Sequence, residues 1–179
     1  MKIDFWEQAI KAYWPKTELI LNIILILIMR WKLIFNMDSI LDYPRHKAVE
    51  YIQRFIGKPY IWGGQGPDGF DCSGLIIEVL RAAGKLGPLE DLNANSLYKK
   101  FQNGRQVKIP YHGCLVFWFK KYLAIHVEML IDNFHTVGAS GGGSHVRTIE
   151  DASKFDAFVK MRPIGYRGKD YKIIDVFKE

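Results

Sequence analysis

The sequence predicts an α+β fold in which helices come first and an antiparallel sheet follows. From about residue 42 onward, segments with helical spacing of apolar residues are followed by short apolar segments divided by turn residues. Sixteen glycines, most of them placed between apolar segments, favour many turns and short strands over a helical bundle. With 179 residues, 49% of them hydrophobic, the chain is long enough for one ordinary core and too short for two comfortable domains.

Three helices are expected in the first part of this domain. Apolar residues recur on one face from about Pro44 to Ile56, and a glycine then ends the pattern. The period returns after Asp71, a natural N-cap, in a helix that has Cys72 in its first turn and ends at Gly84. A third, short helix is expected around Asn95 to Phe101.

Five strands are expected in the second part. The turn between Asp132 and Asn133 and the run from Gly141 to Gly143 divide them, which favours antiparallel pairing of neighbours. The strands are expected at "GCLVFWF", "AIHVEMLI", "FHTVGAS", "HVRTI" and "AFVKMRPI", residues 113–119, 124–131, 134–140, 145–149 and 157–164.

The charge and the cysteine content exclude some classes of function. A net charge of +6 would draw the chain toward anionic polymers such as nucleic acid, acidic lipid or cell wall. The basic residues are scattered and the aromatic residues alternate with apolar ones, so a nucleic-acid-binding role has little support. Two cysteines are too few for a disulfide framework, and the absence of a paired-cysteine metal motif argues against a structural zinc site.

The first 36 residues differ from the rest. The apolar stretch from Leu19 to Met29 is short of the roughly 20 residues that a membrane-spanning helix needs. Mixed charges precede it and no small-residue cleavage site follows, so it is a poor signal peptide. Three interpretations stay open: a short or tilted membrane anchor, a helix that packs on a partner, and a leader outside the fold with Met37 as a second start. We predict residues 1–36 as this apolar leader and residues 37–179 as the domain.

Cys72 is the first candidate for chemistry. In the first turn of a helix, a thiol faces unpaired backbone N–H groups and the positive end of the helix dipole. Both predict that the pKa of Cys72 lies below its usual value of ~8.5, which favours the nucleophilic thiolate. Of the five histidines, His126 is best placed to be its base, near the start of a strand. The alternative is that Cys72 packs as a small buried hydrophobe.

The segment around Cys72 resembles a known family. "PYIWGGQGPDGFDCSGL", residues 59–75, is similar to the nucleophile segment of the NlpC/P60 family of cell-wall cysteine peptidases, in which Asp-Cys-Ser-Gly follows a tyrosine by about a dozen residues. Three later segments, "HGCLVFWF", "HVEMLI" and "TVGASGGG", resemble strands of the family in the same order. The resemblance covers about Tyr43 to Ile164. It implies the papain-like NlpC/P60 fold, with the nucleophile at the start of a helix.

The resemblance also implies roles for individual residues. Cys72 would be the nucleophile and His126 the base. The hydroxyl of Tyr60 would help the backbone N–H of Cys72 to hold the oxyanion. Asp71 would cap the helix, and in some family members the residue at this place helps to bind a free amino group. The candidate substrate-binding residues are Asp71, Ser73 and Trp62. The resemblance implies neither a metal nor an organic cofactor.

The sequence departs from the family pattern at the residue that orients the base. Gly138 stands where a histidine is common. We name His145, after the glycine run, as the candidate third catalytic residue. Glu128, which shares a strand face with His126, is another candidate, and a backbone carbonyl or a water molecule is a further alternative.

Two other departures affect residues outside the expected site. Cys114 stands where the family usually has aspartate, and we interpret it as a packing cysteine at the start of a buried strand. His112 stands where the family usually has proline, and we interpret it as a surface histidine.

The leading functional prediction is a peptidoglycan hydrolase. The thiolate would attack an amide of the stem peptide, near a D-γ-glutamyl or diaminopimelyl residue, and form an acyl-enzyme. Action outside the cytoplasm or on a virion is expected, with residues 1–36 linking the enzyme to a membrane or a larger assembly. A phage lysis or tail-associated protein is one such setting. The alternatives are a lipid or amide acyltransferase of related fold and a catalytically weak wall-binding module, which Gly138 favours.

Overall fold

The structure is a computed structural model that describes residues 20, 22–27 and 42–178. The chain divides into two compact units, Met1–Leu41 and Asp42–Glu179. In the first unit, residues 20 and 22–27 are helical and exposed. The rest of the predicted leader lies outside the described residues. The interpretations of this segment as a membrane anchor or as a partner-binding helix therefore stay predictions. Within the part of the chain that is described, no helix is both long enough and apolar enough to cross a membrane.

The three helices expected in the second unit are confirmed. They are α3 (Tyr43–Gln53), α4 (Cys72–Ala82) and α5 (Ala94–Phe101). Asp71 is the N-cap of α4 as expected, and its side chain accepts a hydrogen bond from the backbone N–H of Gly74. Helix α4 therefore begins at the cysteine that the sequence singled out.

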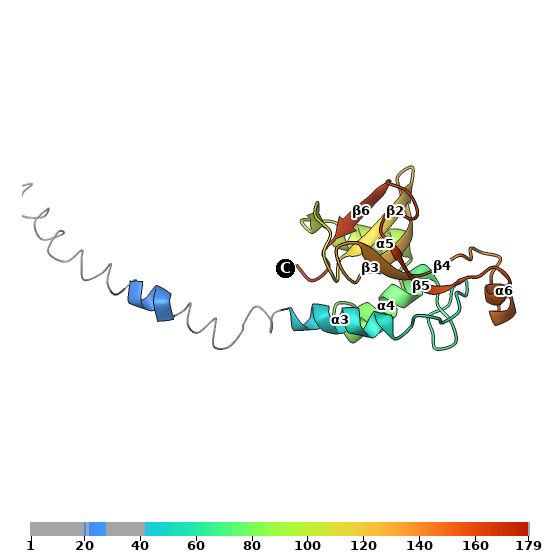
Figure 1. Ribbon diagram of the computed structural model, residues 1–179, viewed down its shortest axis with the longest axis horizontal. Coiled ribbons are helices and arrows are strands. Elements are labelled where there is room, and N and C mark those ends of the chain that lie inside the picture. Colours follow the sequence, from blue (N-terminus) through green and yellow to red (C-terminus); the bar gives the residue numbers. More distant parts are fainter. Residues whose placement is uncertain (1–19, 21, 28–41, 179) are drawn as a thin grey trace, which may run out of the picture. The chain divides into compact units, whose positions relative to one another are not determined.

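The strands form one antiparallel sheet with the order β1-β6-β2-β3-β4-β5 (Figure 1). Four of the five expected strands are present as β2, β3, β4 and β5. Two short strands, β1 and β6, were not predicted; β6 pairs with β2 and extends the sheet. The strands are β1 (Gln106–Val107), β2 (Leu115–Lys120), β3 (Leu123–Leu130), β4 (His135–Ser140), β5 (Phe158–Pro163) and β6 (Tyr171–Ile174).

The strand expected at residues 145–149 was wrong. A turn at residues 144–145 and irregular backbone at residues 146–148 occupy this stretch, and helix α6 (Ile149–Lys154) begins at its end. The side chain of Thr148 accepts a hydrogen bond from the N–H of Asp151, whose own side chain bonds back to the N-cap backbone. This capping box gives hydrogen-bond partners to the free N–H groups at the start of α6. The motif is visible in the sequence as Thr-x-x-Asp.

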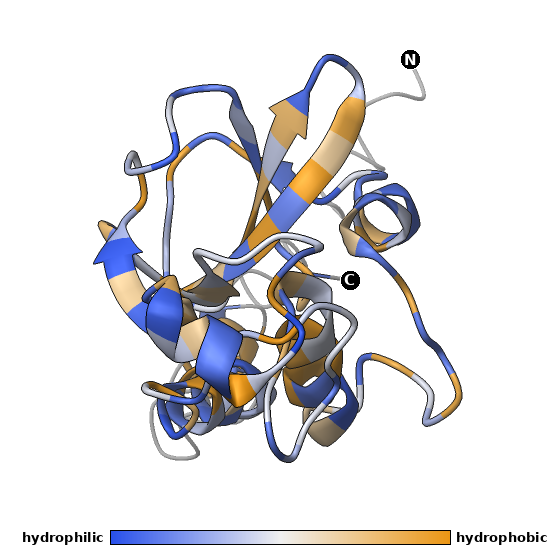
Figure 2. Ribbon diagram, turned by 90° about the vertical axis from the view of Figure 1, so that its right-hand side faces the viewer, coloured by the Kyte–Doolittle hydropathy of each residue, from blue (hydrophilic) through white to orange (hydrophobic). Residues whose placement is uncertain are grey.

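The sheet separates two clusters of buried side chains. Helices α4 and α5 pack against β3, and α4 also contacts β4, so the larger cluster lies between the helices and one face of the sheet (Figure 1). Hydrophobic and hydrophilic residues alternate along part of the sheet (Figure 2), whereas β2 is apolar from Leu115 to Phe119. The smaller cluster is built on Cys114, Val116, Trp118, Leu130 and Ile173. Cys114 is fully buried there with a free thiol, as a packing cysteine should be.

Strand β3 contributes to both clusters. Val127 belongs to the helix-side cluster and Leu130 to the smaller one. Since side chains alternate along a strand, His126 and Glu128 point to the same side as Leu130. His126 pairs with Trp118 across the sheet, and their ring centroids lie 5.6 Å apart. The polar pair on β3 is therefore held against the smaller cluster.

Candidate active site

Three separate segments bring the expected catalytic residues to one cleft. Tyr60 comes from the loop before α4, Cys72 from the first residue of α4, and His126 from β3; all three line a cleft of about 230 Å³. A neighbouring hollow of about 380 Å³ shares Tyr60, Trp62 and Cys72. Cys72 therefore lines both hollows.

The Asp71 carboxylate fixes the start of α4. It accepts hydrogen bonds from the backbone N–H of Gly74 (2.7 Å), the Ser73 hydroxyl (2.9 Å) and the backbone N–H of Gly63 (3.1 Å). These bonds tie the preceding glycine loop to the first turn of the helix and hold Cys72 in place. Asp71 and Ser73 line the larger hollow, and so does Trp62, whose side chain is 52% exposed.

The expectation that the pKa of Cys72 is lowered was wrong. Burial and the nearby Asp71 carboxylate raise the pKa of Cys72 to about 11, although hydrogen bonds from the backbone of Val127 and Ser73 oppose the shift. The desolvation cost and the like-signed neighbour outweigh the favourable helix start. The resting state is therefore a neutral thiol, and a base must take its proton before the sulfur can attack.

His126 is held by a carboxylate on its own strand. Its Nε2 lies 2.9 Å from Oε1 of Glu128, and the two side chains are almost fully buried. Burial lowers the pKa of His126, and the hydrogen bond to Glu128 acts in the opposite direction. An ionised carboxylate only accepts hydrogen bonds, so Nε2 carries the hydrogen and Nδ1 keeps the lone pair. The imidazole is thus neutral and prepared to accept a proton at Nδ1.

Two hydroxyl groups keep Glu128 ionised. The hydroxyl of Thr136 on β4 donates to Oε2 at 2.6 Å, and the hydroxyl of Tyr166 donates to Oε1 at 2.5 Å. Burial would raise the pKa of Glu128, but these bonds and that from His126 outweigh it and hold the pKa below its ordinary value. A fully buried carboxylate with donors on both oxygens is a fixed partner for the imidazole.

Gly138 leaves room for Glu128. The register of β3 and β4 pairs Met129 with Val137, and its continuation sets Gly138 opposite Glu128. A Cβ added to Gly138 would overlap the side chain of Glu128. The position where the family pattern has a histidine is therefore filled in this chain by a carboxylate from the neighbouring strand.

His145, the expected third catalytic residue, does not reach this pair. It is exposed, its ring packs edge-on against Phe155 with centroids 4.9 Å apart, and it does not line the cleft around His126. Glu128, the other candidate named from the sequence, contacts His126 instead. The signal in the sequence was the combination of a carboxylate two residues after the histidine and a glycine at the usual orienting position.

The glycine run covers Tyr60. A Cβ at Gly142 would overlap the Tyr60 ring, so the loop can cross the ring only with glycine at this position. Burial and the nearby Cys72 raise the pKa of Tyr60 to about 12, while a hydrogen bond from the backbone of Gly143 opposes the shift. Tyr60 therefore keeps its proton at neutral pH and can donate a hydrogen bond into the cleft.

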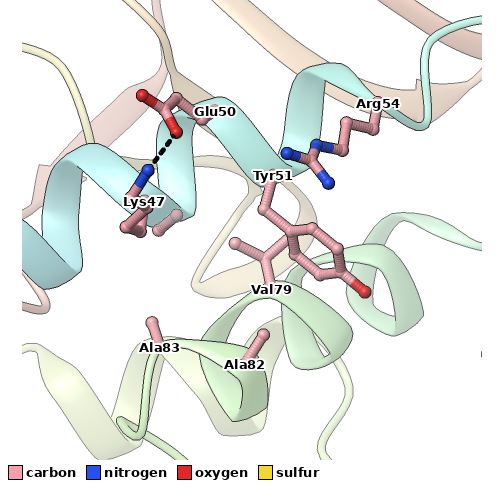
Figure 3. A pocket seen from close by; sticks show the side chains of 8 residues that line it. Lys47, Glu50, Tyr51, Arg54, Val79, Ala82 and Ala83 are labelled. Carbon is pink, nitrogen blue, oxygen red and sulfur yellow. Dashed lines mark hydrogen bonds and ion pairs between the residues drawn. The ribbon is translucent and has the colours of Figure 1, made fainter.

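A further hollow of about 250 Å³ lies between α3 and α4 (Figure 3). Tyr51 extends from α3 toward α4, where its hydroxyl donates to Glu78 at 2.7 Å. Lys47 and Glu50 form an ion pair across one turn of α3 at 2.8 Å. The lining of this hollow contains no cysteine or histidine.

The chain is similar in sequence to two curated proteins. The probable endopeptidase YafL of Escherichia coli (strain K12) is 57% identical over 31 residues, which cover 17% of this chain and 12% of that protein. The gamma-D-glutamyl-L-lysine dipeptidyl-peptidase of Bacillus subtilis (strain 168) is 39% identical over 57 residues, 24% of this chain and 19% of that protein. The matched region thus spans less than a fifth of either curated relative.

The fold is similar to that of solved structures. The peptidoglycan hydrolase RipB of Mycobacterium tuberculosis superposes with a TM-score of 0.51 and 24% sequence identity, over 75% of this chain and 67% of that one. A model of the NlpC/P60 family matches residues 57–162, which include Tyr60, Cys72, His126 and Glu128. The chain therefore belongs to the NlpC/P60 family.

Proposed function

We propose that this protein is a cysteine endopeptidase that cleaves an amide bond in the stem peptide of peptidoglycan, and that residues 37–179 form its catalytic domain. The observation that carries the proposal is that Tyr60, Cys72 and His126 line one cleft while Glu128 binds His126 from behind. A wall substrate implies action outside the cytoplasm, and the net charge of +6 favours contact with anionic wall polymers.

The reaction follows from the protonation states of the cleft. Nδ1 of His126 takes the proton of the Cys72 thiol, and the sulfur attacks the carbonyl carbon of the amide. The backbone N–H of Cys72 and the hydroxyl of Tyr60 stabilise the oxyanion. His126 then gives its proton to the leaving nitrogen, the C–N bond breaks, and a thioester remains on Cys72. Water, deprotonated by His126, hydrolyses the thioester and releases a carboxylate.

Glu128 acts through His126. When the imidazole takes up the thiol proton it becomes a cation in a buried place, and the carboxylate at 2.9 Å stabilises that cation. Because burial alone lowers the pKa of His126, the ionised Glu128 is what keeps the imidazole basic enough to accept the proton. Glu128 is thus a positioning residue that replaces the orienting histidine common in the family.

Opposite charges on the two sides of Cys72 support a particular substrate. The larger hollow carries Asp71, and an adjoining hollow adds Asp91, so this side favours a free amino group. The cleft on the other side carries Arg167, which favours a carboxylate. A D-γ-glutamyl residue is linked through its side chain and keeps a free α-carboxylate next to the scissile bond. A short peptide with an amino terminus and this linkage matches both charges.

The first experiment is mass spectrometry of purified muropeptides incubated with the full chain and with Cys72→Ala. New fragments are expected with the first protein only, and their masses identify the bond. No fragments from the folded, reduced wild-type chain with several wall chemistries would overturn the proposal and favour a wall-binding module. Fragments with both proteins would exclude Cys72 as the nucleophile.

The substrate orientation has its own test. Peptides that contain D-γ-glutamate or its α-amide are compared as substrates of the wild type and of Arg167→Met. The wild type is expected to prefer the carboxylate, and Arg167→Met is expected to lose about tenfold or more in kcat/KM on that peptide, the strength of a charge-assisted hydrogen bond. Equal losses on both peptides would contradict an interaction with the carboxylate.

A further inference from the structure

A second group of histidines and a carboxylate lies outside the cleft. Asp42 precedes α3, His46 lies in the first turns of α3, and His112 precedes β2. Oδ2 of Asp42 lies 3.5 Å from Nε2 of His46 and 3.4 Å from Nε2 of His112. The three ligand atoms all lie within 4.8 Å of one another, and the two imidazole rings stack with centroids 4.8 Å apart.

We propose that Asp42, His46 and His112 form a binding site for a divalent transition metal, with Zn²⁺ as the best fit. Zinc binds imidazole nitrogen at about 2.0–2.1 Å and carboxylate oxygen at about 2.0–2.2 Å, usually with tetrahedral geometry. Two ligand atoms at the corners of such a tetrahedron are about 3.3–3.5 Å apart. The two nitrogen-to-oxygen distances in the cluster match that spacing, and the fourth corner is left for water.

The ligand atoms are available for a metal. Asp42 is the N-cap residue of α3, yet its side chain makes no capping hydrogen bond. Its Oδ1 is paired with Arg45, which leaves Oδ2 facing the two imidazoles. Nε2 of His112 is shielded from solvent and has no hydrogen-bond partner among the described residues. A buried nitrogen without a partner is costly, and a metal ion would remove that cost.

The charge around the cluster permits a cation. Arg45 lies beside Asp42, but its guanidinium also pairs with Asp175 at 3.0 Å. With neutral imidazoles, the two carboxylates and the one guanidinium leave a net charge of −1. The ligand set also selects the metal, because two imidazoles and one carboxylate suit zinc better than calcium or magnesium, which prefer oxygen ligands.

The position in the fold indicates what the metal would do. The backbone N–H of Gly113 donates to Leu130 at the end of β3, so His112 lies beside the C-terminal end of this strand, whereas His126 lies in its middle. A metal bound there would join the start of α3 to the segment before β2, and it would stabilise the domain without touching the cleft. The sequence argued against a structural zinc site because it has no paired-cysteine motif, whereas these ligands are two histidines and an aspartate from two distant segments.

The test is a titration of the full chain, untagged and carrying Cys72→Ala so that the catalytic thiol cannot bind metal. Calorimetry with ZnCl₂ is expected to show one site per chain, and Zn²⁺ is expected to raise the Tm. His46→Ala and His112→Ala are each expected to weaken Zn²⁺ binding at least tenfold. Co²⁺ at the same site is expected to give the strong visible absorption of four-coordinate cobalt.

His135→Ala is the matched control, because His135 is a partly exposed histidine that lies 3.0 Å from a carboxylate, Asp132, and belongs to no cluster with a second imidazole among the described residues. It is expected to leave Zn²⁺ binding unchanged. No binding of Zn²⁺ to the folded protein, or binding that survives both His46→Ala and His112→Ala, would overturn the proposal. Neither result would affect the proposed peptidase activity, which depends on other residues.

Discussion

Two histidine–carboxylate groups lie along β3, one in the middle of the strand and one beside its C-terminal end, and they differ in burial and in partners. His126 and Glu128 are 4% and 0% exposed, and both oxygens of Glu128 accept hydrogen bonds. Asp42 and His112 are only partly buried, His46 is exposed, and Nε2 of His112 has no hydrogen-bond partner among the described residues.

The difference shows how the surroundings decide the chemistry of identical residue types. In the buried pair, both carboxylate oxygens accept hydrogen bonds, so the carboxylate stays ionised and the imidazole has one defined tautomer. Such a pair can hold and move one proton. In the partly exposed group, three ligand atoms lie within 4.8 Å of one another and Nε2 of His112 has no hydrogen-bond partner among the described residues, an arrangement that suits a metal ion.

The largest expected effect comes from neutralising the buried carboxylate. Glu128→Gln keeps the shape of the side chain but removes the charge that stabilises the imidazolium, and its amide can present the wrong group to Nε2 of His126. We expect kcat on a stem-peptide substrate to fall by roughly 100- to 10,000-fold. Circular dichroism of the variant serves as the folding control. Activity within threefold of the wild type would contradict the role given to Glu128.

Moving the orienting group from position 128 to position 138 tests the same role. Gly138→His alone should be poorly tolerated, because a side chain there overlaps Glu128. In a Glu128→Ala background the space is free, and a histidine at position 138 can orient His126 from the adjacent strand. The double variant is expected to have a kcat about tenfold higher than that of Glu128→Ala. Equal kcat in the single and double variants would show that the two positions are not interchangeable.

The next effect is on stability. Gly138→Ala is expected to lower the free energy of unfolding by about 1–3 kcal/mol, because its Cβ must displace a fully buried side chain. Gly165→Ala is the control, since nothing lies within 4 Å of a Cβ there and its φ is not positive. Denaturant unfolding measures both. The same small change in both variants would mean that the sheet adjusts to the overlap.

A pH dependence tests the hydroxyl that supports Glu128. The folded pKa of Glu128 is depressed, so its contribution to stability is present above its unfolded pKa and is lost as the pH falls through the folded pKa. Tyr166→Phe removes one donor and raises that folded pKa. We expect a loss of about 1–2 kcal/mol at neutral pH and acid unfolding at a higher pH. Tyr122→Phe, at a 94% exposed position, should change neither quantity.

The smallest effect is expected in the metal-free cluster. With EDTA present, His46→Ala should change the free energy of unfolding by less than about 0.5 kcal/mol, because its side chain is 53% exposed and its ion pair is weak. The measurement is denaturant unfolding with and without Zn²⁺. A loss above 1 kcal/mol in EDTA would indicate that the cluster stabilises the fold without a metal.

Local signals in the sequence were enough for part of the fold and part of the site. Asp71 followed by an apolar helical period predicted α4 and its cap, and the segment around Cys72 identified the nucleophile candidate and the family. These features depend on neighbours within a few residues, where capping and periodicity act. The strand at residues 145–149 failed because its β-branched residues suggested extension, while the capping box of Thr148 and Asp151 starts a helix.

Only the tertiary structure decided the rest. Strand register set Glu128 opposite Gly138 and against His126, and it left His145 exposed. Burial then raised the pKa of Cys72, reversing what the helix start alone predicted. The sequence by itself determined the candidate residues for the chemistry, because motifs and caps are local. Strand pairing decides which carboxylate contacts which imidazole, and burial decides the dielectric surroundings of the pair. Both depend on distant segments, so only the folded chain defines them.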